Sequence, residues 1–314
     1  MNICMVGYGA IAEKHMEALS GIDDIRPLVL VGRRPDPSAA FARQWRFEHH
    51  TLDLDEALAN KQVEAVIITS PNEQHFPQSQ KTLRAGKHLL LEIPMAMNAA
   101  DAQRLTALSR KLDRRLMICH SMRYMPAMRE VHDRIAQGRL HLHQIVAFFG
   151  VLRRMNTTST GKARSWTDNI LWHHAAHLVD LSLWVCGCRQ APDVHCRFGP
   201  PHPTQSVMDL HMTMTLPPRV LVCIAESYNI SVYRWRVLFI GEEATLEFDD
   251  GTLYDGQGKV VVPHRSIVDL HDQDQEFVNA IQAGRDPGIT GEDVLPAMET
   301  LQKAQASAKG AWAF

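Results

Sequence analysis

The first third of the chain alternates short apolar runs with segments of helical periodicity. The apolar runs lack the in–out alternation of strands that face water, so they predict strands buried on both faces of a sheet. They span residues 2–7, 27–32, 63–69, 86–94 and 115–120. The segments between them have helical spacing, and Asn98 is the expected N-cap of one such helix. Residues 1–120 are therefore predicted to form a doubly wound, Rossmann-type α/β domain.

The pattern changes after residue 120. Strand-like segments there are joined by turns, with Asp250-Gly251 and Asp255-Gly256 as hairpin signals. Helices are predicted over residues 125–138, 168–187, 274–284 and 294–305. Residues 121–314 are therefore expected to form one α+β domain with an open mixed sheet, which serves substrate binding and oligomerisation.

Composition places the chain among globular proteins with an ordinary core. Its 314 residues are 45% hydrophobic and carry a formal charge of −2, so no basic surface for nucleic acid is expected. No apolar stretch reaches the ~20 residues of a membrane span. Residues 1–10 lack the basic leader and small-residue cleavage site of a signal peptide. A cytoplasmic location is the resulting expectation.

A glycine motif marks the candidate nucleotide site. Gly7-Tyr8-Gly9-Ala10-Ile11-Ala12 matches G-x-G-x-x-G/A, follows a predicted strand and opens a predicted helix. In this motif the first glycine allows a tight turn, and the second lets the backbone approach a pyrophosphate. A small residue at the position of Ala12 permits close packing of helix on sheet. The residues expected to bind the dinucleotide are Gly7, Gly9, Ala10, Ile11 and Ala12.

The end of the second strand distinguishes NAD from NADP. An acidic residue there binds the ribose of NAD, whereas this chain has Arg33 and Arg34. Two guanidinium groups can neutralise a 2′-phosphate and stack on adenine. The alternative is a solvated basic turn. We therefore expect NADP as the cofactor, with NAD as the alternative.

Four features together resemble the Gfo/Idh/MocA oxidoreductases over essentially the whole chain. They are the glycine motif, "TSPNEQH" at 69–75, "EIP" at 92–94 and the mixed second domain. The resemblance implies cofactor contacts from Thr69, Ser70, Pro71, His75, Glu92 and Ile93. A structural role at the start of a helix is the alternative for His75. The family typically has E-K-P, with a lysine that takes part in proton transfer, where this chain has Ile93.

One subgroup of the family, with isoleucine at this position, is similar in further segments. These are "RRMN" at 153–156, the stretch 161–181 and "QDQEF" at 273–277. That subgroup oxidises a carboxylated ring-cleavage semialdehyde of protocatechuate 4,5-cleavage, as its cyclic hemiacetal, to a pyrone lactone. The substrate-binding residues that the resemblance implies are Arg123, Arg153, Asn156, Arg164 and Trp166. The chain departs from the subgroup at 120–126, where one arginine and one asparagine are absent, so the exact substrate stays open.

Because Ile93 cannot carry a proton, another group must accept the substrate's hydroxyl proton. Histidine suits this role, since its pKa lies near working pH. His173 and His177 are spaced i, i+4 and are expected on one helical face, with His174 about 100° away. The resemblance pairs His177 with Asp180 as the family's usual histidine and downstream acid. We predict catalytic roles for His173, His177 and His174; buried core histidines and a zinc site are the alternatives, and no metal is expected.

The sequence thus predicts an NADP-dependent dehydrogenase acting on a small anionic carboxylate substrate. A sugar or polyol dehydrogenase of the same family is one alternative, against which the missing lysine counts. A non-catalytic NADP-binding regulatory protein is the other, and it would have no need of the histidines. A homodimer is expected, with neither nucleic acid nor membrane as a partner.

Overall fold

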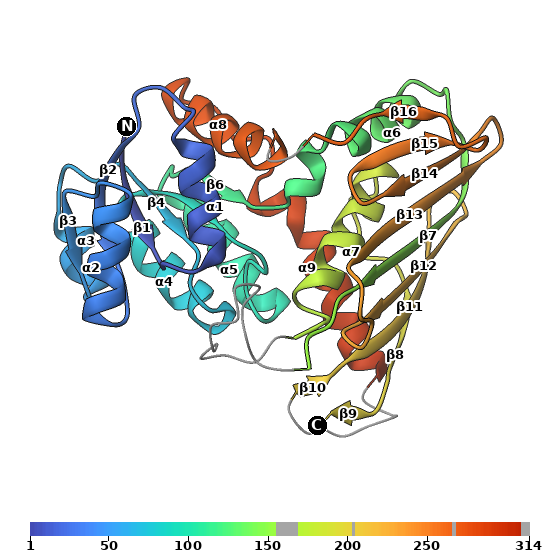
Figure 1. Cartoon of the computed structure of the whole chain (residues 1–314), viewed down its shortest axis with the longest axis horizontal. Helices are drawn as coiled ribbons and strands as arrows, with labels where there is room; N and C mark the ends of the chain where they lie inside the picture. The colour runs from blue at the N-terminus through green and yellow to red at the C-terminus, as the bar shows by residue number, and fades with distance from the viewer. Residues whose placement is uncertain (155–168, 203–204, 266–267, 309–314) are drawn as a thin grey trace. The chain divides into compact units, whose positions relative to one another are not determined.

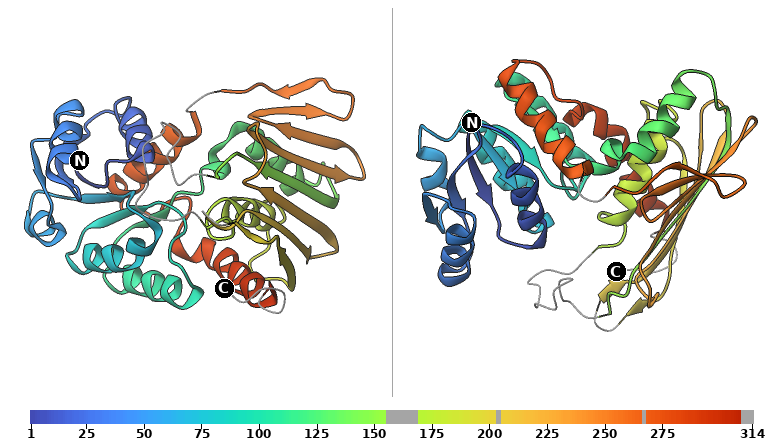
Figure 2. Two further views of the ribbon diagram at one scale, coloured as in Figure 1. Left: turned by 60° about the horizontal axis from the view of Figure 1, so that its bottom comes forward. Right: turned by 45° about the horizontal axis from the view of Figure 1, so that its top comes forward.

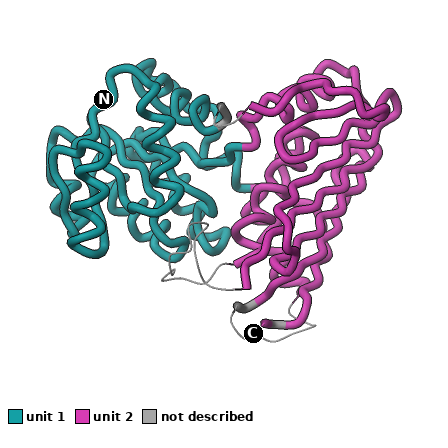
Figure 3. Tube along the Cα trace, in the orientation of Figure 1, with its two compact units in different colours: residues 1–121, 270–295 teal, residues 122–269, 296–314 magenta. Residues whose placement is uncertain are grey.

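The computed structural model describes residues 1–154, 169–202, 205–265 and 268–308 (Figure 1). The chain divides into two compact units. Unit 1 comprises residues 1–121 and 270–295, and unit 2 comprises residues 122–269 and 296–314 (Figure 3). The expected fold class is confirmed: a parallel Rossmann-type sheet is followed by a second, mixed sheet.

Unit 1 contains a six-stranded parallel sheet with the order β3-β2-β1-β4-β5-β6. Its strands are β1 (Asn2–Val6), β2 (Arg26–Val31), β3 (His49–Thr51), β4 (Ala65–Ile68), β5 (His88–Leu91) and β6 (Leu116–Ile118). The helices between them are α1 (Ala10–Leu19), α2 (Pro35–Gln44), α3 (Leu54–Ala59), α4 (Asn72–Arg84) and α5 (Ala99–Lys111). Asn98 caps α5 as expected, since its Oδ1 accepts the backbone N–H of Asp101 at 2.8 Å. The strand order reverses between β1 and β4, the point where such sheets bind ligands.

Residues 270–295 belong to unit 1, which differs from the expected continuous domain over 121–314. Helix α8 (Val268–Gln282) lies beside α1 (Figure 2), and the residues after it reach β6. There the Ile118 N–H donates to the Ile289 carbonyl at 3.2 Å, and Met117 forms a bridge with Thr290. Helical periodicity identifies a helix but not the sheet on which it packs, so the sequence did not reveal this return.

Unit 2 contains an eight-stranded sheet with the order β16-β15-β14-β13-β7-β12-β11-β8. Its strands are β7 (Leu142–Gly150), β8 (Val194–Phe198), β11 (Asp209–Leu216), β12 (Val220–Ser227), β13 (Arg234–Gly241), β14 (Thr245–Asp249), β15 (Thr252–Asp255) and β16 (Val260–Val262); β9 (Pro201–His202) and β10 (Gln205–Val207) form a separate pair. Only β7 and β12 pair in parallel among these neighbours. In β11, Leu210, Met212 and Met214 are buried while the residues between them are not, so the sheet buries one face.

Helices cover the buried face of this sheet. They are α6 (Pro126–Ala136), α7 (His174–Val185) and the part of α9 (Gly291–Ala308) that belongs to unit 2; a short 3₁₀ helix, η1 (Ser121–Tyr124), precedes α6. Helix α7 packs on β7 and β12 (Figure 2). Across the described segments, no helix combines the length and apolar character needed to cross a membrane.

Helix α7 is shorter than the helix expected over 168–187. It begins at His174, and Asn169 Oδ1 accepts the backbone N–H groups of Leu171 (3.1 Å) and Trp172 (3.2 Å). The His173 N–H also donates to the Asn169 carbonyl at 2.9 Å, so residues 170–173 form a turn capped by Asn169. His173 therefore precedes the helix, with φ −104° and ψ −89°.

Candidate active site

The turn between β1 and α1 has the shape that a phosphate group requires. Gly7 adopts φ +116°, and a Cβ there would lie 2.5 Å from Thr69 Oγ1, so only glycine fits. At Gly9 an added Cβ would meet no protein atom within 4 Å, which leaves the backbone open to a ligand. Ala10 and Ile11 form the first turn of α1, and Ala12 is fully buried against the sheet. These positions suit a pyrophosphate at the N-terminus of α1.

Two cationic side chains follow β2. Arg33 and Arg34 are exposed, and Arg34 is the N-cap residue of α2. Within the described ranges, neither guanidinium group forms a hydrogen bond or an ion pair with the protein. Gly32, which the sequence analysis did not single out, has no room for a side chain, since a Cβ would lie 1.8 Å from Ser38 Oγ. The turn is thus held tightly by its backbone while both arginine side chains extend into solvent.

His75 joins the loops that follow β4 and β5. Its Nδ1 is 2.7 Å from the Pro94 carbonyl oxygen and its Nε2 is 2.8 Å from the Ser70 carbonyl oxygen. The ring is buried, and burial lowers its pKa, although the two carbonyl groups oppose that shift. Thr69 also ties its loop to β1, because its Oγ1 donates to the Val6 carbonyl at 3.0 Å. These contacts are consistent with the structural alternative for His75, and its contact with the cofactor stays a prediction.

Glu92 belongs to a group of bonded polar side chains that includes two buried residues. Its Oε1 is 2.9 Å from His15 Nε2, and His15 Nδ1 is 2.7 Å from Asp274 Oδ2. Burial opposes protonation of His15, but the charge of Asp274 and its hydrogen bonds raise the His15 pKa well above its ordinary value. Cys119 lies beside the group, and burial raises the pKa of its thiol above the usual range. His15, Glu92 and Cys119 each offer one ligand atom, all within 4.8 Å of one another.

Sequence reasoning missed His15 and Asp274 as site residues. His15 stands on the apolar face of a predicted helix, which favours a core role, and Asp274 is 259 residues away. Ile93, the next residue after Glu92, is buried at 5% exposure. Its side chain therefore contributes packing at this edge of the sheet and no polar contact.

In unit 2, Arg123 and Asp180 form a buried, bidentate ion pair. Arg123 Nε donates to Asp180 Oδ2 at 2.8 Å and its Nη2 donates to Oδ1 at 2.6 Å. The pair connects η1 to α7. The acid that the resemblance paired with His177 is thus bonded to Arg123, so the fork of this guanidinium is engaged by a protein carboxylate before any substrate binds.

The three predicted histidines lie in different environments. The His174 ring is buried, its Nδ1 is 2.8 Å from Tyr228 Oη, and it stacks on Phe149 with a centroid distance of 4.0 Å. The His173 ring stacks on His174, also at 4.0 Å. The expectation that His174 points away from His173 is therefore wrong, because His173 precedes α7 and does not have helical geometry. His173 and His177 are half-buried, and the His177 ring centroid is 5.9 Å from that of Trp235.

Arg153 lies at the same end of the second sheet. Its guanidinium carbon is 5.4 Å from the Tyr228 ring centroid, and its backbone N–H donates to the Tyr228 carbonyl at 2.9 Å. Burial lowers the pKa of Arg153, and burial raises the pKa of neighbouring Tyr233 to about 12. Three predicted substrate residues, Asn156, Arg164 and Trp166, lie outside the described residues.

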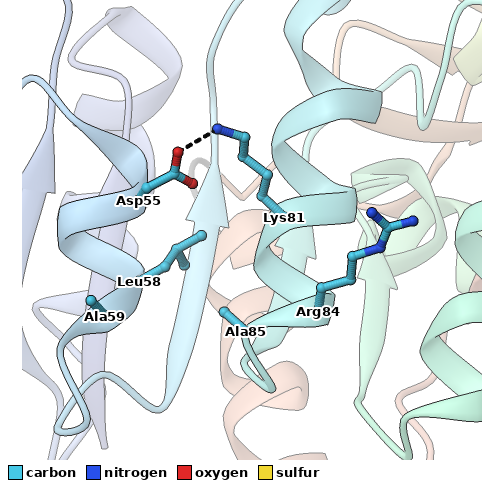
Figure 4. A pocket seen from close by; sticks show the side chains of 6 residues that line it. All are labelled: Asp55, Leu58, Ala59, Lys81, Arg84 and Ala85. Atoms are coloured by element: carbon cyan, nitrogen blue, oxygen red, sulfur yellow. Dashed lines mark hydrogen bonds and ion pairs between the residues drawn. The ribbon is translucent and has the colours of Figure 1, made fainter.

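A surface hollow of about 430 Å³ lies elsewhere on unit 1, between α3 and α4 (Figure 4). An ion pair between Lys81 Nζ and Asp55 Oδ2, 2.6 Å apart, spans it, and Arg84 lines its side. These residues lie toward the C-terminal end of α4, whereas the loop containing Ser70 and Pro71 precedes that helix. The hollow is therefore separate from the candidate cofactor site.

The two halves of the chain match two sequence families. Residues 1–120 match the oxidoreductase family with an NAD-binding Rossmann fold, Gfo/Idh/MocA, and residues 126–264 match the C-terminal domain of bacterial oxidoreductases. The chain belongs to the Gfo/Idh/MocA family of oxidoreductases. It is an NAD(P)-dependent dehydrogenase, which confirms both the resemblance and the expected enzyme class.

Among particular proteins, the chain is 31% identical to 4-carboxy-2-hydroxymuconate-6-semialdehyde dehydrogenase from Sphingobium sp. over 96% of each chain. It is 28% identical to inositol 2-dehydrogenase from Rhizobium meliloti over 43% of this chain and 41% of that one. The crystal structure of scyllo-inositol dehydrogenase from Lactobacillus casei, with bound NAD(H) and scyllo-inositol, is similar in fold. Its TM-score is 0.83 at 18% identity, covering 99% of this chain and 97% of that chain.

Proposed function

We propose that the protein is an NADP-dependent dehydrogenase that oxidises a carboxylated ring-cleavage semialdehyde, as its cyclic hemiacetal, to a pyrone lactone. The observation that carries this proposal is the similarity to the Sphingobium semialdehyde dehydrogenase, which extends over 96% of both chains. The inositol 2-dehydrogenase match covers only 43% of this chain. Ile93 in place of the family's lysine supports the same choice.

The oxidation removes a hydride and a proton from one hemiacetal centre. NADP⁺ supplies the hydride acceptor when it is bound. A base must take the hydroxyl proton, and an imidazole with a pKa near neutrality suits that step. His177 and His173 are the half-buried histidines at the start of α7, and we assign the proton to one of these two. His174 supports them from beneath, because its ring is buried and held by Tyr228 and Phe149.

A carboxylated substrate needs a cation, and we assign that role to Arg153. Arginine binds carboxylates through paired N–H groups. Arg153 lies over the ring of Tyr228, whose hydroxyl group is 2.8 Å from His174 Nδ1, so its guanidinium group is held near the histidines of α7. Arg123 is less suited, because Asp180 already engages its fork. The half-buried ring of Trp235, 5.9 Å from the His177 ring, favours a flat substrate over a polyol.

The cofactor preference and the assembly are further parts of this proposal. Arg33 and Arg34, both exposed after β2, support NADP through its 2′-phosphate. Leu221 is exposed on β12 while its neighbours Val220 and Val222 are buried, so it lies on the other face of the second sheet; pairing of that face with a second copy supports a homodimer. A polyol dehydrogenase remains the second candidate, favoured by the inositol 2-dehydrogenase match.

A substrate panel tests the proposal. Purified protein is mixed with NADP or NAD and with either a freshly prepared ring-cleavage semialdehyde of protocatechuate or inositol isomers, and reduced cofactor is followed by its absorbance. We expect kcat/KM to be highest for the semialdehyde with NADP. Higher kcat/KM for an inositol, or no turnover with the semialdehyde, would contradict the proposed substrate.

A further inference from the structure

The chain Asp274–His15–Glu92 in unit 1 has no assigned part in the reaction above. Asp274 and His15 are fully buried, whereas the Glu92 side chain is 14% exposed. Each ring nitrogen of His15 faces a carboxylate oxygen, at 2.7 Å and 2.9 Å. The imidazole satisfies both contacts only by donating two hydrogen bonds, so the cationic form fits this environment. The result is a fixed imidazolium between two carboxylates.

Both oxygens of Glu92 are oriented by this arrangement. Oε1 accepts from His15 Nε2, and Oε2 accepts the backbone N–H of Ile93 at 3.1 Å. A carboxylate offers about four acceptor positions, so Glu92 can still contact a ligand. Because both oxygens of Glu92 accept hydrogen bonds, the plane of its carboxylate group has little freedom to rotate.

The topology places this carboxylate at the nicotinamide end of the site. Glu92 directly follows β5, and β5 neighbours β4 in the sheet. A dinucleotide binds across the carboxyl ends of the strands, with its pyrophosphate at the β1–α1 turn and its adenosine ribose beside β2. The nicotinamide half then extends over β4 and β5, where Glu92 stands.

We propose that His15 and Asp274 are positioning residues that fix the Glu92 carboxylate against the nicotinamide ring. Asp274 acts through His15, and His15 acts through Glu92. The inference rests on the proposed function only in requiring a nicotinamide cofactor. Hydride transfer needs the reacting atoms about 3–3.5 Å apart, and a misplacement of ~1 Å costs ~10²-fold in rate. Loss of the orientation therefore lowers kcat, while the adenosine and phosphate contacts maintain cofactor affinity.

Two substitutions of one residue separate the two contacts of His15. In His15→Gln the side-chain amide reaches the position of Nε2 and can still donate to Glu92. In His15→Asn the amide takes the position of Nδ1 and retains only the contact with Asp274. Both variants remove the imidazole from the same buried position, so each is the structural control for the other.

The fluorescence of bound NADPH and kcat are the two measurements. We expect His15→Asn to change the emission of bound NADPH and to lower kcat by ~10²-fold, with little change in the dissociation constant of NADPH. His15→Gln is expected to resemble the unchanged protein in emission and to lose less than about tenfold in kcat. Equal effects of the two variants on both measurements would overturn the proposal.

Further variants keep the test decisive. When Glu92→Gln is also present, His15→Asn and His15→Gln should no longer differ in NADPH emission or in kcat, because His15 acts through the Glu92 carboxylate. A remaining difference in either measurement would overturn the proposal. If His15→Asn does not fold, Asp274→Asn must change the NADPH emission in its place, and an unchanged spectrum would contradict the proposal. One equivalent of tightly bound metal in the purified protein would also overturn it, because His15 Nε2 would then be a ligand and not a donor. The emission measurement needs no substrate, so absent turnover would contradict the proposed function and leave this comparison intact.

Discussion

At position 93 the chain has a buried isoleucine at the edge of the nucleotide-binding sheet. An alkyl group neither accepts nor donates a proton, so other side chains must provide the charge beside the cofactor and accept the substrate's proton. Glu92 presents an oriented carboxylate, which His15 holds from beneath. We propose that Glu92 thereby supplies the charge beside the cofactor, and that a histidine, not the side chain at position 93, accepts the proton.

Arg33 carries the proposed preference for NADP. Its guanidinium is exposed directly after β2, where the 2′-phosphate of NADP is bound in dinucleotide folds. Arg33→Ala should raise KM for NADP by about tenfold, equivalent to ~1.4 kcal/mol, and leave KM for NAD nearly unchanged. The control is Arg43→Ala, an exposed arginine in the last turn of α2, which should alter neither KM. Equal increases in KM for the two cofactors after Arg33→Ala would remove the phosphate contact from the account.

The geometry of the candidate cofactor site could be predicted where neighbouring residues determine it, and not where residues distant in the sequence determine it. Gly7 follows from a turn that admits no other side chain, and Gly9 follows from a backbone that is left open to a ligand; a short motif records both. The His15–Asp274 contact joins residues 259 positions apart, and no local sequence pattern predicts it. His75 has the right position in the sequence, but only the structure shows that both ring nitrogens are used by backbone carbonyl groups.

At the scale of elements, the start of α7 decides how its histidines are used. Periodicity places His173 and His177 on one helical face, but the backbone of His173 is not helical and α7 begins only at His174. His173 then stacks on His174, and the two no longer point in different directions. Amphipathic spacing cannot reveal this, because the break lies in the backbone angles of one residue and leaves the pattern of apolar positions unchanged.

Strand β12 carries one acidic residue on its buried face. Val222, Ile224 and Glu226 alternate inward, and Glu226 is 2% exposed. Within the described ranges, neither of its carboxylate oxygens has a hydrogen-bond partner. Burial raises the pKa of Glu226 well above 4.5, its ordinary value. The protonated form is therefore the one that the folded state favours.

This pKa shift predicts that Glu226→Gln raises the thermal stability of the protein by an amount that depends on pH. A folded-state pKa above the unfolded value means that the stability linked to this group is fully present below about pH 4.5 and is lost as pH rises through the folded pKa. Glutamine has nearly the same shape and carries no charge, so it removes that loss. We expect Tm at pH 8 to rise by about 2–4 °C, the shift that ~1 kcal/mol gives in a domain of this size. Calorimetry at pH 8 and at pH 4.5 measures Tm for both proteins, and the increase in Tm should be smaller at pH 4.5. An equal increase at the two pH values would rule out the titration of Glu226 as its cause.

At the scale of the whole molecule, the two units are not two consecutive halves of the chain. Residues 270–295 return to unit 1 and bring Asp274 to His15. The class of fold could be predicted because alternating strands and helices, followed by hairpins, are local patterns. The return of residues 270–295 to unit 1 could not be predicted, because α8 would have the same apolar periodicity on either sheet. The polar group beside Glu92 is consequently complete only when the second half of the chain has been made.

The central claim is that an imidazole at the start of α7, and not the side chain at position 93, accepts the hydroxyl proton. The most direct measurement is kcat for His177→Ala and His173→Ala with NADP and the ring-cleavage semialdehyde, with and without imidazole added to the buffer. One of the two variants should lose ~10²–10⁴-fold in kcat, the range for removal of a general base, and added imidazole should restore part of that loss. Full activity in both variants would contradict the account.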